Sequence, residues 1–304
     1  MDTRKIDLHV HSTHSDGARS VKEIAVVAKK DGIAAIALTD HDTVGGVAEA
    51  EREFKGQGIE LIPGVELSTG YKGFRIDILG LFIDPESAEF AKLIGVLTGR
   101  RERRAETMAK GLAGLGFDIG FADVKVQQTG DVIGKPHVVK ALLSKETNIA
   151  RIKADMRTAG IEPSQPAIRE FVFSAYLSRG KRAHVSDEQQ LDPKMAIDAI
   201  HSAGGIAVIA HPCSEDYEIS EDVFRELVRF GMDGVEMWGG AKSFDSLKWL
   251  RDISDELGLL KTEGSDYHGY GHNDHLGFHD VERTRPIRYE VMERLRDGMA
   301  ARKE

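Results

Sequence analysis

The 304-residue sequence has little cysteine and no long apolar run. Cys213 is its only cysteine, so disulfides cannot hold the fold together and a reducing cytoplasm is the expected location. No segment approaches the ~20 apolar residues of a membrane-spanning helix. The N-terminus also lacks the apolar stretch and cleavage site of a secretory signal. These absences predict a cytoplasmic protein that does not interact with a membrane.

Positive charge is also in deficit. Aspartate and glutamate number 50 against 41 lysines and arginines, which gives a formal net charge of -9. An acidic chain repels the phosphates of long nucleic acids, which disfavours non-specific binding to them. The composition favours a small phosphorylated substrate such as a nucleotide and leaves short RNA as an alternative. It does not indicate an oligomeric state.

Short apolar runs alternate with helical segments over the first 85 residues. Strand-like runs lie at Ile6–Val10, Ile33–Leu38, Ile59–Leu67 and Phe74–Phe82. Ser20 opens a capping-box sequence for a helix that Gly32 closes. Strands separated by such helices predict βαβ units and a sheet buried on both faces.

The pattern changes near Pro85 to long amphipathic segments, and the α/β rhythm returns from Met195. Two of these segments are expected as separate helices at Ser87–Leu97 and Arg101–Leu115. We therefore expect one α/β barrel-like domain, formed by residues 1–98 and 184–304. A helical insertion at residues 99–183 would interrupt it and cover the active site.

Metal-seeking side chains lie in or directly after the strand-like runs. They are His9, His11, Asp16, Asp40, His41, Glu66, Asp77, His211, Asp266 and His268. The carboxyl ends of parallel strands meet at one face of an α/β fold, so these residues can converge despite their separation in the chain. Imidazole nitrogens with carboxylate oxygens and no thiolates suit manganese, iron or zinc. The sequence thus predicts a multinuclear metal centre.

Six motifs follow one another in a fixed order along nearly the whole chain. They are His9-x-His11-x4-Asp16-Gly17, Thr39-Asp40-His41, Gly64-Val65-Glu66, Ile78-Leu79-Gly80, Ala210-His211-Pro212 and Gly264-Ser265-Asp266-x-His268. The set resembles the PHP family, the polymerase and histidinol phosphatase domain. The resemblance implies a distorted (β/α)7 TIM-like barrel with a trinuclear centre. It is greatest to a subgroup with a helical insertion, which includes nucleoside 3′,5′-bisphosphate phosphatases.

The resemblance also implies how three divalent ions would share the ligands. One ion would take His9, His11, Glu66 and Asp266, a second Asp16, His41 and His268, and a third Glu66, Asp77 and His211. Asp40 would be either a carboxylate that orients a ligand or one that faces the site.

Two positions depart from the family pattern. Asp77 stands where relatives usually have histidine, which places one more negative charge at the third ion. Cys213 follows His211-Pro212 where many relatives have glycine and then arginine, so a phosphate-binding arginine is missing. Both changes bear on the identity of the substrate.

The expected chemistry is hydrolysis of a phosphate ester by metal-activated water, without a nucleophilic serine or cysteine. His211 or His268 would help the leaving alkoxide, and Asp40 is the third candidate catalytic residue. Lys135 and His137 lie at a helix start in the insertion, where free N–H groups favour an anion, and are the candidate substrate-binding residues. The alternative for these two is an ordinary helix that begins with proline.

Three functions remain open at this stage. The first is a phosphatase for small phosphomonoesters, with a nucleoside 3′,5′-bisphosphate as the leading substrate and an AMP-like product. The second is a phosphodiesterase that acts on a cyclic sugar phosphate, or a 5′–3′ exoribonuclease on short RNA. The third is a non-catalytic module that binds metal or nucleotide.

Overall fold

The computed structural model describes residues 4–178, 180–185, 190–213, 219–237, 244–270, 274–279 and 283–301. The chain divides into two compact units. The first combines Met1–Ile94 with Gln189–Glu304, and the second comprises Gly95–Glu188. No helix among the described residues is both long enough and apolar enough to cross a membrane.

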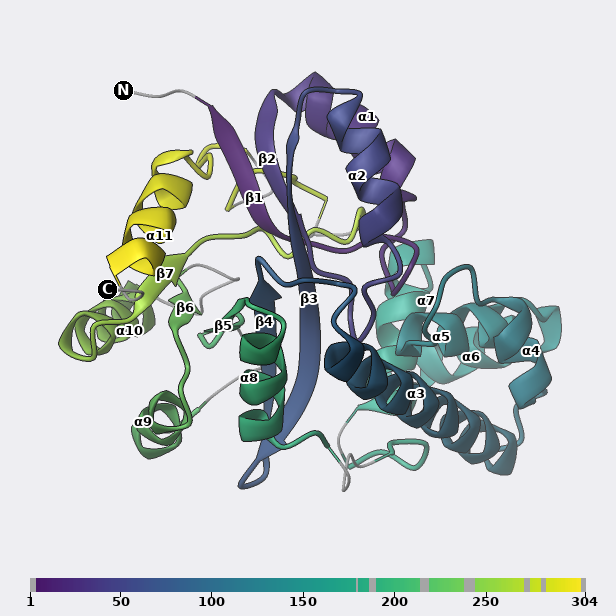
Figure 1. Cartoon of the computed structure of the whole chain (residues 1–304). Coiled ribbons are helices and arrows are strands. Elements are labelled where there is room, and N and C mark those ends of the chain that lie inside the picture. The colour runs from purple at the N-terminus through teal and green to yellow at the C-terminus, as the bar shows by residue number, and fades with distance from the viewer. Residues whose placement is uncertain are drawn as a thin grey trace. The chain divides into compact units, whose positions relative to one another are not determined.

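A curled seven-stranded sheet forms the centre of the first unit (Figure 1), with the strands in chain order. The strands are β1 (Lys5–Val10), β2 (Ile33–Leu38), β3 (Glu60–Tyr71), β4 (Phe74–Leu81), β5 (Ile206–Ile209), β6 (Gly234–Glu236) and β7 (Leu260–Thr262). Strands β1 to β3 are parallel, and so are β5 to β7. A parallel bridge also joins Val10, at the end of β1, to Tyr267, a few residues after β7. The combination of this sheet with helices makes the unit a mixed α/β fold.

Strand β4 runs antiparallel to both of its neighbours. This differs from the βαβ repeat expected from the sequence, and the cause is the connection between β3 and β4. Only Lys72 and Gly73 separate the strands, and both have positive φ, 49° and 83°. Two such residues favour a tight hairpin whose twist matches that of the strands, which reverses the chain without a crossover helix. As a result, β4 begins at the edge of the sheet where its neighbours β3 and β5 end.

Six helices with described bounds accompany the sheet. They are α1 (Val21–Asp31), α2 (Val47–Lys55), α8 (Pro193–Ser202), α9 (Glu221–Arg229), α10 (Phe244–Glu256) and α11 (Glu290–Ala301). The capping box predicted for the first helix is confirmed, with Ser20 and Glu23 satisfying each other's backbone N–H groups and Gly32 left-handed at the end. Ile24 and Ala28 of α1 pack on Ile36 of β2 in one apolar cluster. Burial of these side chains fixes the ends of β1 and β2, where site residues begin.

The second unit is helical. It contains most of α3 (Ala88–Gly114), with α4 (Phe121–Val126), α5 (Lys135–Leu143), α6 (Glu146–Thr158), α7 (Gln165–Val172) and a π-helical turn at Phe173–Leu177. Leu112, Val138, Ile152 and Val172, from four of these helices, share its apolar core. The two helices expected at Ser87–Leu97 and Arg101–Leu115 are one continuous helix. Gly99 lies between the two segments, and one helical glycine costs only about 1 kcal/mol, which the rest of the helix can offset.

Candidate metal centre

The metal-seeking residues come from the strand ends of the first unit. His9 is in β1 and His11 directly after it, while His41 follows β2 and is bridged to Glu66 of β3. Asp77 lies in the middle of the antiparallel strand β4, opposite Ser68 of β3. The remaining ligand candidates follow the later strands: His211 comes after β5, and Asp266 and His268 come after β7.

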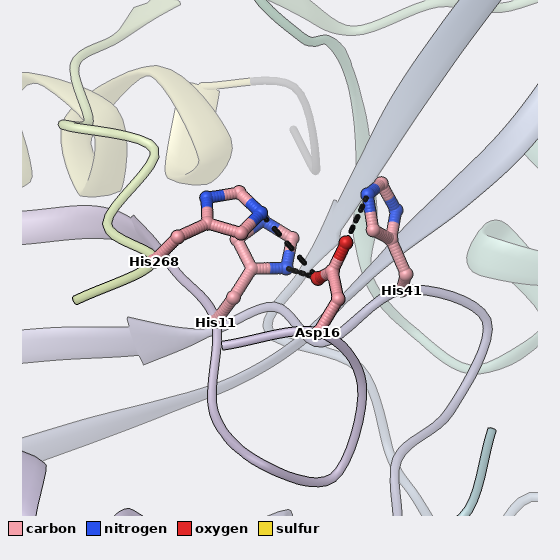
Figure 2. A group of neighbouring side chains, drawn as sticks. All are labelled: His11, Asp16, His41 and His268. Atoms are coloured by element: carbon pink, nitrogen blue, oxygen red, sulfur yellow. Dashed lines mark ion pairs between the residues drawn. The ribbon is translucent and has the colours of Figure 1, made fainter. Parts of the chain in front are cut away.

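Three groups of these side chains place their ligand atoms within 4.8 Å of one another. The groups are His9, His11, Glu66 and Asp266; His11, Asp16, His41 and His268; and Glu66, Asp77 and His211. They bring together all nine residues that the sequence singled out as ligands, and His11 joins a second group. Figure 2 shows that second group, in which the Asp16 carboxylate lies between the imidazoles of His11, His41 and His268.

Glu66 lies at the middle of the cluster. Its Oε2 atom is 3.4 Å from His9 Nε2, 3.2 Å from His11 Nε2 and 3.0 Å from His41 Nδ1. Its other oxygen, Oε1, is 3.0 Å from His211 Nε2. Among the described residues, none donates a hydrogen bond to Oε2, although the atom is buried. Nitrogens gathered around a buried oxygen without such bonds are what an ion-bridging carboxylate requires.

The imidazole geometry also fits a metal ion. His9 Nε2 and His11 Nε2 face each other at 3.1 Å. Two imidazoles that each bind one ion at about 2.0–2.1 Å place their nitrogens roughly 3 Å apart at ordinary angles. Buried His11 Nδ1 has no hydrogen-bond partner among the described residues, although it lies 3.7 Å from Asp16 Oδ1. The donor set is therefore suited to manganese, iron or zinc.

Neighbouring groups of opposite charge shift the pKa values of the imidazoles and carboxylates in the cluster. Burial on its own would lower the pKa of His11, but the nearby carboxylates of Asp266 and Glu66, each 3.2 Å from its Nε2, outweigh it and raise the pKa to about 10. Burial would raise the pKa of Glu66, but His41 and His9 outweigh it and hold that pKa well below its usual range. A divalent ion that binds here must displace imidazole protons, so its affinity falls as the pH falls.

Backbone strain and close packing bring two of the ligands inward. His211 and Asp266 have positive φ, 31° and 53°, a region that non-glycine residues rarely adopt. Gly264 lies so close to β1 that a Cβ atom there would be 2.3 Å from the Cβ of His9 and 2.7 Å from Glu236 Oε1. Only glycine fits between these side chains, so the approach of Asp266 to His9 depends on it.

Asp40 lies beside the cluster without joining any of the three groups. Its carboxylate accepts hydrogen bonds from the Ser12 amide at 2.8 Å, the Ser12 hydroxyl at 2.7 Å and the Ser15 hydroxyl at 2.5 Å. These bonds fix the turn between His11 and Asp16. The contacts favour the orienting role over the site-facing one.

Two buried carboxylates that the sequence reasoning missed also support the ligands. Asp7 accepts from the backbone and hydroxyl of Ser265 at 3.0 and 2.6 Å, and so holds the segment before Asp266. Glu236 contacts His9 Nδ1 at 3.2 Å through Oε1 and accepts from the His211 amide at 2.8 Å through Oε2. The second had a signal, because the tripeptide Gly-Val-Glu that ends in Glu66 occurs again at the end of β6.

A Glu236→Gln variant tests this support. The amide keeps the size of the side chain but no longer stabilises the His9 Nδ1–H donor with a full negative charge, so His9 becomes a weaker ligand. We expect metal affinity or turnover to fall about 10–100-fold. Titration of bound metal by mass spectrometry measures the loss, with Glu263→Gln as the control, since Glu263 pairs with His279 outside the three groups. Equal losses in both variants would contradict a specific role for Glu236.

The candidate substrate-binding residues lie in the second unit, which is described by itself. Lys135 is the first residue of α5, and His137 is buried two residues later. His137 Nδ1 accepts from the Gly134 amide at 3.0 Å, which closes the N-terminus of the helix. That bond engages one imidazole nitrogen in capping, and a contact of either residue with substrate stays a prediction.

Comparisons with known proteins agree with the site. The PHP domain family model matches residues 7–156. A 5′–3′ exoribonuclease of Haemophilus influenzae is 35% identical over 88% of this chain and 90% of its own length. A 3′,5′-nucleoside bisphosphate phosphatase of Chromobacterium violaceum is 34% identical over 95% of this chain and 97% of its own.

A solved structure is also similar over nearly the whole chain. An amidohydrolase of Chromobacterium violaceum, determined with bound sulfate and no metal, has a TM-score of 0.76 and 30% identity, and the match covers 95% of this chain and 96% of that one. The family model, the curated relatives and the fold thus agree with the ordered motifs and with the three residue groups. The chain belongs to the PHP family of metal-dependent phosphoesterases.

Proposed function

We propose that this protein hydrolyses small phosphomonoesters at a trinuclear metal centre, and that a nucleoside 3′,5′-bisphosphate is its leading substrate. The observation that carries the proposal is the convergence of nine candidate ligand residues into three groups. Glu66 belongs to two of these groups, and so does His11. The similarity to a 3′,5′-nucleoside bisphosphate phosphatase over nearly the whole of both chains supports the choice of substrate.

Manganese, iron or zinc at the three groups would lower the pKa of bound water and neutralise charge on the phosphoryl oxygens. The chain's own residues arrange this chemistry. Glu66 lies between the groups, and Asp7 and Asp40 fix the loops that carry Asp266 and Asp16. His211 and His268 belong to different ligand groups, and either imidazole is a candidate to assist the leaving alkoxide. The products are an alcohol, AMP-like for a bisphosphate, and inorganic phosphate.

The helical unit completes the proposed enzyme. In this proposal Lys135 and His137 of the helical unit bind the phosphate or the sugar of the substrate. A helix N-terminus offers N–H donors to an anion, and α5 begins with these residues. The protein acts in the cytoplasm, which its single cysteine favours.

The second candidate is a 5′–3′ exoribonuclease on short RNA, which the 35% identical relative favours. The same ligand groups serve a phosphodiester, because the chemistry at phosphorus is unchanged. A cyclic sugar-phosphate diesterase remains the third possibility for the same reason. The non-catalytic module is disfavoured, because a protein that only binds would not need a complete set of ligands for three ions.

One panel separates these activities. Purified protein with its metals quantified is assayed for release of phosphate from 3′,5′-bisphosphates and simple monoesters, and for cleavage of cyclic phosphates and 5′-phosphorylated short RNA. We expect kcat/KM to be highest for the bisphosphate. A higher value for RNA would replace the first candidate by the second. No turnover on any substrate with three metals bound would contradict all three enzyme activities.

A further inference from the structure

Arg75 and Asp77 form an ion pair at the edge of the metal cluster. Arg75 Nη2 is 2.7 Å from Asp77 Oδ2, and Arg75 Nε is 3.4 Å from Asp77 Oδ1. The Asp77 side chain is fully buried, whereas 43% of the Arg75 side chain is exposed. A guanidinium group thus lies between one of the three ligand groups and solvent.

The position follows from the direction of β4. Residues two apart on a strand point to the same face, so Arg75 shares the face of Asp77. Arg75 pairs with Gly70 of β3, whereas Asp77 pairs with Ser68. Since β4 is antiparallel to β3, Arg75 lies closer than Asp77 to the edge of the sheet where β3 ends. The strand carries the arginine outward from the buried cluster to the surface, where 43% of its side chain is exposed.

The positive charge of Arg75 offsets the negative charge of Asp77. A buried carboxylate at this position weakens the attraction of the centre for a phosphate, because it adds negative charge beside the ions. A guanidinium stays positive, so Arg75, whose Nη2 lies 2.7 Å from Asp77 Oδ2, offsets the negative charge of that carboxylate.

We propose that Arg75 is a phosphate-binding residue of this centre and that it sets the preference for substrates with a phosphomonoester dianion. A guanidinium has five N–H donors in a planar fork, and the Arg75 side chain that pairs with Asp77 also reaches the surface, where 43% of it is exposed. The same group can hold the Asp77 carboxylate in place and donate to a phosphoryl oxygen. The proposal rests on the proposed function, since it concerns the substrate of the same site.

The test compares Arg75→Ala and Arg75→Lys with Lys72→Ala. Lys72 is in the same hairpin and pairs with Glu226 on the surface, so its removal reports any general damage to β3 and β4. In Arg75→Ala we expect KM for a bisphosphate to rise about 10–100-fold with a smaller change in kcat, as for the loss of one charged hydrogen bond. Arg75→Lys keeps the charge without the fork and should recover part of the loss.

A second measurement does not depend on turnover. Inorganic phosphate is titrated into each metal-loaded variant by calorimetry, and bound metal is counted in the same samples. We expect phosphate to bind Arg75→Ala about 10–100-fold more weakly than wild type at equal metal content. Unchanged phosphate affinity, with or without a change in metal content, would assign Arg75 to the support of Asp77 alone and overturn the proposal.

The two proposals fail in different ways. If the wild-type protein hydrolyses none of the substrates but binds phosphate through Arg75, the proposed function is wrong and the phosphate site stands. If the wild-type protein hydrolyses bisphosphates and Arg75→Ala does so with unchanged KM, the phosphate site is wrong and the function stands. Arg75→Lys serves both comparisons if the alanine variant does not fold.

Discussion

A Glu66→Gln variant is expected to lose turnover, with kcat reduced about a thousandfold or more. Glutamine has the shape of glutamate, so the fold of β3 is retained. The carboxylate, however, is the group that four imidazole nitrogens approach within 3.4 Å, and it belongs to two of the three ligand groups. The neutral amide removes the negative charge shared by these groups and turns N–H donors toward nitrogens that must bind metal.

The measurement combines steady-state kinetics with metal content by mass spectrometry. We expect bound metal to fall together with kcat, because Glu66 would bridge ions rather than contact the substrate alone. Glu49→Gln is the matched control, since Glu49 pairs with His14 at 3.1 Å outside the three groups and should leave turnover close to wild type. Wild-type kcat in Glu66→Gln would show that Glu66 is not a metal ligand that the reaction requires.

Strand and helix positions were largely predictable because they depend on local patterns. The run Ile33–Leu38 is β2 at the same bounds, and the first helix begins and ends at the caps read from Ser20 and Gly32. Strand direction was not predictable from apolar runs, because the same run suits a parallel or an antiparallel strand. The antiparallel direction of β4 depends on the two residues Lys72 and Gly73, and their positive φ is visible only in the structure.

The ligand candidates were predictable because their chemistry and spacing are specific. Same-side pairs such as His9 with His11 point at one site whatever the rest of the fold does. Supporting carboxylates carry a weaker signal. Asp7 resembles any buried strand residue until its partner is known, and Glu236 is marked only by the second Gly-Val-Glu tripeptide. The pair of Arg75 with Asp77 was not predictable for a related reason, because the sequence does not show that the two side chains meet on β4.

Removal of metal is expected to abolish turnover while the fold is retained. A chelator takes away the group that activates water, and no residue of the cluster replaces it. The sheet and its apolar clusters do not depend on the ions, so circular dichroism should keep its helical signal after chelation. Turnover should return when manganese, iron or zinc is added back, and full activity in the presence of chelator would contradict a metal-dependent reaction.

The stability of the chelated protein should also depend on pH in a defined direction. The folded pKa of His11 is about 10, above the 6.5 of a free imidazole, so its stabilising contribution is complete below pH 6.5 and is lost as the pH rises toward 10. Asp16 and Glu66 have lowered pKa values, because nearby imidazoles outweigh the effect of burial, and their contribution is lost instead as the pH falls through the acid range.

A metal ion takes the place of the imidazole protons, so the loaded protein lacks the loss at high pH. We therefore expect the difference in Tm between loaded and chelated protein to grow from roughly pH 6.5 to pH 9, since protons stabilise only the chelated form. Differential scanning fluorimetry of both forms in the same buffers measures this difference, and groups away from the centre cancel in it. A difference that is constant over this range would mean that His11 and its neighbours do not bind the metal.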